Sequence, residues 1–170
     1  STKYFKDDSF AHPTTTFTDE FLIKTSRNTN SAWKSYNVSG NDNQSLMMQF
    51  SNEDDLYLGL PGGDFYSNVS GISDGVWHHL VRTSNRTSGA EKIYLDGQLI
   101  YNQTVQAGSL ITTNGHYYIG QQDSPGGGLD ASQAFDGFLP IVRLYNRVLT
   151  AEEVSSNYSS MISNGNPTPV

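Results

Sequence analysis

The sequence lacks three features, and each absence limits what the protein can be. It contains no cysteine in 170 residues, which excludes disulfide bonds, zinc–thiolate sites and cysteine nucleophiles. Basic residues are scarce and scattered, with ten Lys and Arg against seventeen Asp and Glu. Nucleic acids and anionic membranes are bound through clustered basic residues, so neither is an expected partner. No apolar stretch approaches the roughly 20 residues of a membrane span, so no membrane insertion is expected.

Two observations bear on the compartment. No signal peptide is visible from Ser1 onward, as expected of a mature secreted product or a cytosolic protein. Six Asn-X-Ser/Thr sequons offer acceptors for N-glycosylation, at Asn37, Asn43, Asn68, Asn85, Asn102 and Asn157. This number favours a secreted, extracellular glycoprotein.

Helical periodicity is also nearly absent, and short extended segments alternate with clusters of Gly, Asn, Asp and Ser. Runs of alternating large and polar residues predict half-buried strands. The expected strands cover residues 20–24, 32–38, 45–50, 56–60, 75–83, 92–95, 98–101, 117–119 and 138–145. Asp96 and Gly97 form a type I′ hairpin signal between two of them. Many short strands at this spacing predict an all-β jelly roll or sandwich of antiparallel sheets.

One helix is predicted near the C-terminus. Thr150 and Glu153 match a capping box, with Thr150 at the N-cap and Glu153 at the third helical position, ahead of residues 154–161. We expect a single domain over residues 1–163. The segment 164–170, rich in Asn and Pro, is expected to be a disordered tail or a linker.

Residues 119–137 form a polar loop with oxygen-bearing side chains and no basic residue. Three consecutive glycines at 126–128 exclude helix there and disfavour strand. Two interpretations stay open at this point. The loop is either a solvated surface segment or a cage for a hard cation, because calcium takes six to eight oxygen ligands.

Three segments, in this order, resemble the laminin-G/pentraxin branch of the concanavalin A-like jelly rolls. They are Trp77-His78-His79-Leu80-Val81, then Ile93-Tyr94-Leu95-Asp96-Gly97, and finally residues 135–154. The resemblance covers residues 17–158 and implies a jelly roll whose last strand leads into a short helix. It departs from pentraxins at the two family cysteines, whose places fall near Glu20 and Val81.

The loop 120–137 is similar to the pentraxin calcium loop, in which a Gln-Asp pair precedes two glycines, an acid and a Ser-Gln pair. By this resemblance Gln122 would contribute its backbone carbonyl, and Gln121 stands where the family has a glutamate. Pentraxins draw further ligands from a distant Asp-Asn pair, and Asp42-Asn43 occupies the corresponding place. The implied ligand set is Asp42, Asn43, Gln121, Gln122, Asp123, Asp130 and Gln133. Calcium suits amide and backbone oxygens in a flexible cage better than magnesium does.

These features predict a calcium-dependent carbohydrate-binding protein, a lectin, in which Asp42, Asn43 and Asp123 also meet the sugar. Tyr36, Phe50 and Phe135 lie near the two loops in sequence and are candidates for stacking on a sugar ring, although such residues are commonly core. The shortage of basic residues favours a neutral glycan, with a galactose-type sugar as one candidate. A homo-oligomer would strengthen weak single-site binding.

Other functions were weighed against this one. An adhesion module with a structural calcium is the first alternative, and pentraxin-like phosphocholine binding is the second. Glycosidases need two carboxylates flanking the scissile bond, and the alternating acidic strand of related hydrolases is missing here. The sequence also lacks nucleophile-elbow, Walker and HExxH motifs, so no enzyme activity is expected. His78 and His79 point to opposite faces of one strand and cannot jointly hold a metal.

Overall fold

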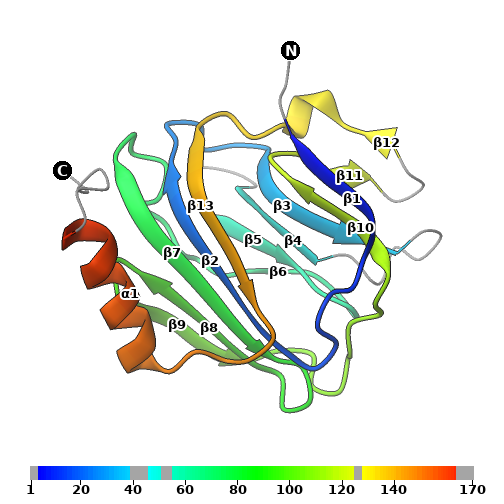
Figure 1. The fold of residues 1–170 in the computed structure, drawn as a ribbon. Coiled ribbons are helices and arrows are strands. Elements are labelled where there is room, and N and C mark those ends of the chain that lie inside the picture. The colour runs from blue at the N-terminus through cyan, green and yellow to red at the C-terminus, as the bar shows by residue number, and fades with distance from the viewer. Residues whose placement is uncertain (1–3, 39–45, 51–54, 125–127, 164–170) are drawn as a thin grey trace. The chain divides into compact units, whose positions relative to one another are not determined.

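The protein is described by a computed structural model. It covers residues 4–38, 46–50, 55–124 and 128–163. Within these ranges the elements are strands, one three-residue 3-10 helix and one α-helix (Figure 1). The prediction for residues 164–170 falls outside the described residues. The chain divides into two compact units, each built around one antiparallel sheet.

The first unit comprises residues 1–14, 27–71 and 109–136. Its six-stranded sheet has the order β1-β10-β3-β4-β5-β6. The bounds are β1 Phe5–Phe10, β10 Gly115–Ile119, β3 Ser31–Asn37, β4 Leu46–Phe50, β5 Leu56–Gly59 and β6 Phe65–Tyr66. A small hairpin, β11 (Asp123–Ser124) with β12 (Gly128–Leu129), and the 3-10 helix η2 (Ala131–Gln133) complete it.

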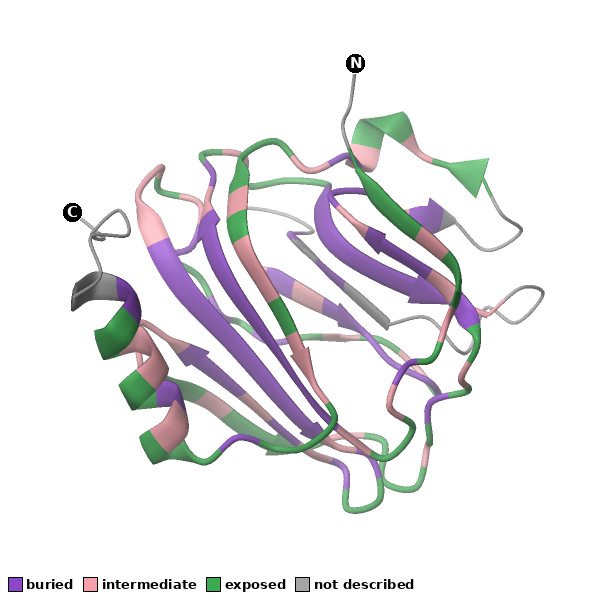
Figure 2. Ribbon diagram, in the orientation of Figure 1, coloured by how far each residue is buried: buried purple, intermediate pink, exposed green. Residues whose placement is uncertain are grey.

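Strand β3 is the centre of this unit. Every residue from Ser31 to Asn37 is buried, as the purple ribbon in Figure 2 shows. The Trp33 ring lies 4.9 Å from that of Phe50, both fully buried. Gly115 is required on the neighbouring strand, because a Cβ there would lie 2.5 Å from the carbonyl oxygen of Asn37. Burial on both faces makes β3 a rigid support for the loops beside it.

The second unit comprises residues 15–26, 72–108 and 137–170. Its five-stranded sheet has the order β13-β2-β7-β8-β9. The bounds are β13 Phe138–Tyr145, β2 Thr16–Lys24, β7 Trp77–Asn85, β8 Ala90–Leu95 and β9 Gln98–Thr104, and the helix α1 spans Ala151–Ser163. In Figure 1 α1 runs alongside this sheet.

Two local predictions are confirmed here. Thr150 and Glu153 form the capping box: the Glu153 amide donates to the Thr150 hydroxyl at 3.2 Å, and the Thr150 amide donates to the Glu153 carboxylate at 2.8 Å. Asp96 and Gly97 both have positive φ, 50° and 77°, as a type I′ turn requires between β8 and β9.

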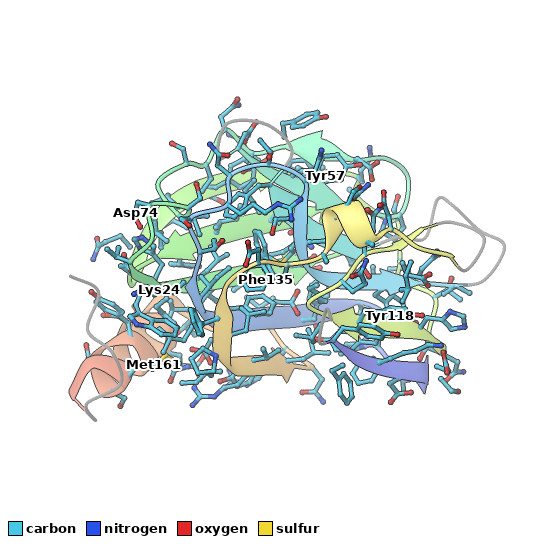
Figure 3. The ribbon with its side chains drawn as sticks, turned by 90° about the horizontal axis from the view of Figure 1, so that it is seen from above. Lys24, Tyr57, Asp74, Tyr118, Phe135 and Met161 are labelled. Atoms are coloured by element: carbon cyan, nitrogen blue, oxygen red, sulfur yellow. The ribbon has the colours of Figure 1, made fainter. Side chains whose placement is uncertain are left out.

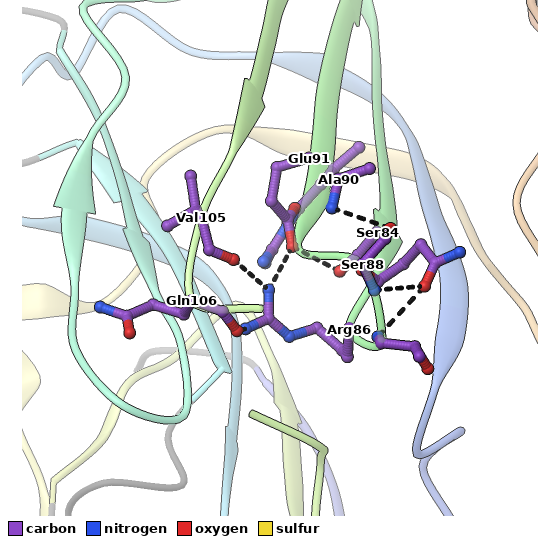
Figure 4. A network of polar contacts seen from close by, with 10 residues as sticks. Ser84, Arg86, Ser88, Ala90, Glu91, Val105 and Gln106 are labelled. Atoms are coloured by element: carbon purple, nitrogen blue, oxygen red, sulfur yellow. Dashed lines mark hydrogen bonds and ion pairs between the residues drawn. The ribbon is translucent and has the colours of Figure 1, made fainter. Parts of the chain in front are cut away.

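Several buried charges in the second unit form ion pairs with hydrogen bonds. Figure 4 shows the guanidinium of Arg86 donating to Glu91 and to the carbonyls of Val105 and Gln106. Glu91 also accepts from Arg82 at 3.0 Å. These bonds offset the cost of removing the charges from water.

Glu20 is the centre of a second buried network. Its carboxylate accepts hydrogen bonds from residues of β7, β13 and α1, namely His79, Arg143, Tyr145 and Asn157. His79 is fully buried, and its Nε2 atom lies 2.9 Å from Oε1 of Glu20. Glu20 pairs directly with Val81 across β2 and β7, so the two positions matched to the family cysteines are cross-strand neighbours.

Candidate metal site on the loop 119–137

Both ends of the loop are attached to β3. The Gly120 amide donates to the Trp33 carbonyl at 2.9 Å, and the Phe135 amide donates to the Gly120 carbonyl at 3.1 Å. Ala134 forms a parallel bridge with Ala32. Phe135, labelled in Figure 3, also places its ring 6.4 Å from that of Trp33. The described parts of the loop are therefore supported by a rigid strand.

The loop has local structure that sequence patterns did not predict. Asp123 pairs with Leu129 in the β11–β12 hairpin, and Asp130 then caps the 3-10 helix η2. Residues 125–127, with two of the three glycines, lie outside the described residues. The pairing brings the Gln122–Asp123 side of the loop next to the Asp130–Gln133 side.

Asp123 is a buried carboxylate that its own chain leaves unsatisfied. Its side chain is about 1% exposed, and neither carboxylate oxygen has a hydrogen-bond partner in the described part of the chain. The Nδ1 atom of His116 lies 3.3 Å from Oδ2, close enough for an ion pair but outside hydrogen-bond geometry. Burial raises the pKa of Asp123 above its ordinary value, against the lowering effect of His116. A buried anion in this state is costly without a cation.

Two amide oxygens of the same loop share this condition. Oε1 of Gln122 and Oε1 of Gln133 are buried and lack hydrogen-bond partners among the described residues. Leaving a buried acceptor unpaired costs about 1–3 kcal/mol each. Together with Asp123, three of the residues predicted as metal ligands therefore have free acceptor oxygens, although for Gln122 the resemblance implied the backbone carbonyl instead of the side chain.

Asp130 and Gln121 are used differently. Oδ1 of Asp130 accepts from the amide and hydroxyl of Ser132, and Oδ2 accepts from Nε2 of Gln133 at 3.0 Å. These bonds, the Ser132 hydroxyl first, lower the pKa of Asp130. The amide nitrogen of Gln121 donates to the carbonyls of Asp130 at 2.6 Å and Gln122 at 3.4 Å.

Of the second predicted loop, Asp42 and Asn43 lie outside the described residues, so the structure does not place them relative to Asp123. Their assignment as ligands stays a prediction. Within the described ranges, no three His, Asp or Glu side chains gather as a metal-binding group. The candidate donors are mainly amide and carboxylate oxygens, which suit a hard cation such as calcium.

The predicted sugar-stacking role is wrong for two of the three aromatic candidates. Tyr36 and Phe50 are 0% exposed and cannot offer a ring face to a ligand. The Tyr36 hydroxyl donates to the Thr112 carbonyl and accepts from the Gly115 amide, so it is fully used inside the first unit. Phe135 is partly exposed and stays a candidate.

Sequence patterns missed two residues of the site. Ser35 on β3 contacts the backbone on both sides of Gln122, and His116 on β10 lies beside Asp123. Tyr118, labelled in Figure 3, follows His116 on the same strand. The only sequence signal for Ser35 and His116 was the alternation of side chains along their strands. Alternation assigns a residue to one face of a strand but does not identify the loop that packs there.

A laminin G family model, described as the concanavalin A-like lectin/glucanases superfamily, matches residues 2–155. The chain is 32% identical over 128 residues to the sushi, von Willebrand factor type A, EGF and pentraxin domain-containing protein 1 of Rattus norvegicus. This match covers 74% of the chain but 4% of that protein, so the chain spans a small part of the relative's length.

Two solved structures are similar in fold. The heptameric SAP-like pentraxin from Limulus polyphemus has a TM-score of 0.75 at 24% identity, covering 91% of this chain and 75% of that one. Domain 4 of the arabinanase AbnA from Geobacillus stearothermophilus, in complex with arabinotriose, has a TM-score of 0.66 at 15% identity. That likeness covers 89% of this chain and 70% of the other. These likenesses confirm the predicted jelly-roll fold. No helix within the described ranges is long and apolar enough to cross a membrane.

Proposed function

Because the chain belongs to the concanavalin A-like lectin/glucanases superfamily, we propose that it is a secreted, calcium-dependent carbohydrate-binding module. The proteins similar to this chain include pentraxins and a pentraxin domain-containing protein, as the sequence resemblance implied. The same fold occurs in a domain whose structure was solved in complex with arabinotriose. Binding rather than catalysis is the proposed activity, and the heptameric relative supports a homo-oligomer.

The observation that supports calcium is the set of buried oxygens without partners. Both carboxylate oxygens of Asp123 and the amide oxygens of Gln122 and Gln133 are acceptors that the described chain does not use. Asp123, Gln122 and Gln133 would hold the ion, and Asp42 and Asn43 would add ligands from the second loop. Bound calcium supplies positive charge and open coordination positions for hydroxyl oxygens.

The chain's own residues do the remaining work. The strand β3 holds both ends of the loop, so these ends lose little further freedom when a ligand arrives. The net charge of −7 and the scarcity of basic residues favour a neutral sugar, with a galactose-type glycan as one candidate. Phe135, near the end of the loop, remains the aromatic candidate.

One observation favours the second candidate function, an adhesion module with a structural calcium. With Tyr36 and Phe50 buried, two of three proposed sugar-stacking rings are lost. In that case calcium would order the loops, and a protein surface would take the place of the glycan.

A glycan array probed in calcium and in excess EDTA distinguishes these functions. The lectin function predicts binding that needs calcium and disappears in Asp123→Asn while the circular dichroism of the β-protein is kept. A structural calcium predicts that calcium raises the melting temperature without any glycan being retained. Glycan binding that persists in EDTA would overturn the calcium-dependent mechanism.

A further inference from the structure

Gln121 is a predicted ligand whose side-chain amide nitrogen is engaged inside the loop. It is 2% exposed, and its amide group faces two carbonyl oxygens, those of Asp130 and Gln122. Two acceptors at one end of an amide require its nitrogen there, which fixes the orientation of the group. The nitrogen therefore ties the Gln122 side of the loop to the Asp130 side.

Ser35, on strand β3, also holds the loop in place through two hydrogen bonds. It is 3% exposed, and its hydroxyl donates to the Gln121 carbonyl and accepts from the Asp123 amide, both at 3.0 Å. One side chain on the rigid strand β3 thus fixes the backbone on each side of Gln122. The orientation of Asp123 follows from this contact, because its amide cannot turn without breaking the bond.

We infer that Gln121 and Ser35 are positioning residues that assemble the metal site before the ion binds, and that Gln121 is not itself a ligand. The inference rests on the proposed calcium function and deepens it. Preformed ligands lose less conformational entropy on binding, so the two contacts act on calcium affinity without touching the ion. Gln121 and Ser35 together orient the three residues with unpartnered oxygens, which are Gln122, Asp123 and Gln133.

Replacing Gln121 by glutamate gives opposite predictions for the two roles. A ligand would gain a negative charge and bind calcium more tightly. A positioning residue would lose its hydrogen-bond donor. The new carboxylate would then face the carbonyl oxygens of Asp130 and Gln122, and the repulsion between them would separate the two sides of the loop. We expect Gln121→Glu to bind calcium at least about ten-fold more weakly than the wild type, because the donor is lost and the new carboxylate repels both carbonyls.

Ser35 has a matched control in the same unit. The hydroxyl of Ser67 likewise donates to a carbonyl, that of Leu56 at 2.9 Å, and accepts from an amide, that of Val69 at 3.2 Å. Ser67 is also buried, at 5% exposure, but follows β6 at the edge of the sheet. Its loss should affect stability in the same way as the loss of Ser35 and leave the calcium loop unchanged.

The experiment is calorimetric titration of calcium into chelator-treated full chains, with amide hydrogen exchange at Asp123 measured before calcium is added. We expect Ser35→Ala to weaken calcium binding about ten-fold and to speed exchange at Asp123, since the hydroxyl that accepts from the Asp123 amide is lost. Ser35→Thr, which keeps the hydroxyl, should restore both, and Ser67→Ala should bind calcium like the wild type.

The outcomes are distinguishable. Tighter calcium binding by Gln121→Glu, or unchanged binding and exchange in Ser35→Ala, would overturn the positioning role while leaving the calcium site intact. A wild-type protein that binds no calcium would instead overturn the proposed function, and the positioning role with it. Equal weakening by Ser35→Ala and Ser67→Ala would show a general loss of stability in place of positioning.

Discussion

Glu20 and Asp123 are both carboxylates with almost no exposed surface, yet the protein treats them in opposite ways. Glu20 lies among four donors from three elements, whereas the oxygens of Asp123 have no hydrogen-bond partner in the described part of the chain. Burial raises the pKa of both groups. For Glu20 the donors outweigh burial and lower its pKa to about 2, whereas for Asp123 burial prevails and its pKa is raised.

The difference separates a structural acid from a candidate ligand. A buried carboxylate satisfied by its own chain holds that chain together, and another ligand would have to displace its donors. A buried carboxylate without donors is destabilising until a cation arrives. Burial and charge alone do not distinguish the two, and only the hydrogen-bond partners do.

The largest expected effect comes from removing the satisfied acid. Glu20→Ala leaves Arg143, His79, Tyr145 and Asn157 without their shared acceptor, and we expect the free energy of unfolding to fall by about 3–5 kcal/mol. Urea denaturation monitored by circular dichroism measures this change. Glu20→Gln, which keeps the size and one acceptor oxygen, should lose less. A fall under about 1 kcal/mol for Glu20→Ala would show that the network contributes little.

Lowering the pH should destabilise the protein by protonating Glu20. The pKa of Glu20 is lowered from 4.5 to about 2, so its contribution is present above pH 4.5 and is lost as the pH falls toward 2. We expect about 3 kcal/mol of unfolding free energy to disappear across that window, from a shift of this size. Denaturation at several pH values checks the slope. Glu20→Gln should flatten it, and an equally steep slope in that variant would assign the loss to other acids.

Calcium should stabilise the protein through Asp123, the carboxylate without hydrogen-bond donors. At a hundred times its dissociation constant, calcium is expected to stabilise the wild type by about 2.7 kcal/mol. Asp123→Asn should abolish this gain, and without calcium it should be no less stable than the wild type, because a buried carboxylate without hydrogen-bond donors is removed. Thermal melts with calcium and with EDTA test both halves. A large loss of stability in calcium-free Asp123→Asn would make Asp123 a structural acid like Glu20.

The smallest effect tests a single donor. Asn157→Ala removes the one contact of α1 with Glu20, a 2.9 Å hydrogen bond, while the other three donors remain. We expect a loss of about 1–2 kcal/mol, because a hydrogen bond to a charged group contributes that much. The calcium-induced rise in melting temperature should stay the same. A changed calcium response would contradict the separation of the two regions.

Local sequence patterns were sufficient for much of the fold. The capping box at Thr150 and the hairpin turn at Asp96-Gly97 depend on contacts within four residues, so the sequence alone places them. The strand at residues 138–145 was predicted with the bounds it has. Strand β1 was not predicted, because its exposed, charged segment resembles a loop until it pairs with β10.

The candidate site was predictable only in part. A polar loop with amide and carboxylate oxygens and no basic residue indicated a candidate cation site, and three of its predicted ligands, Asp123, Gln122 and Gln133, have buried oxygens without hydrogen-bond partners among the described residues. The pattern could not say that Gln121 and Asp130 have other partners, or that Tyr36 faces inward. Side-chain alternation places neighbouring strand residues on opposite faces, but it does not identify the buried face.

The sequence by itself determined the fold class, the scarcity of positive charge and the position of the oxygen-rich loop, because composition and short-range periodicity specify these. The tertiary structure decided which of those oxygens remain available. Ser35 meets Asp123 from a strand 88 positions away, and Glu20 meets Asn157 across 137. A buried acceptor becomes a structural bond or a candidate ligand according to the donors that strand pairing brings beside it, and those donors lie far away in the chain.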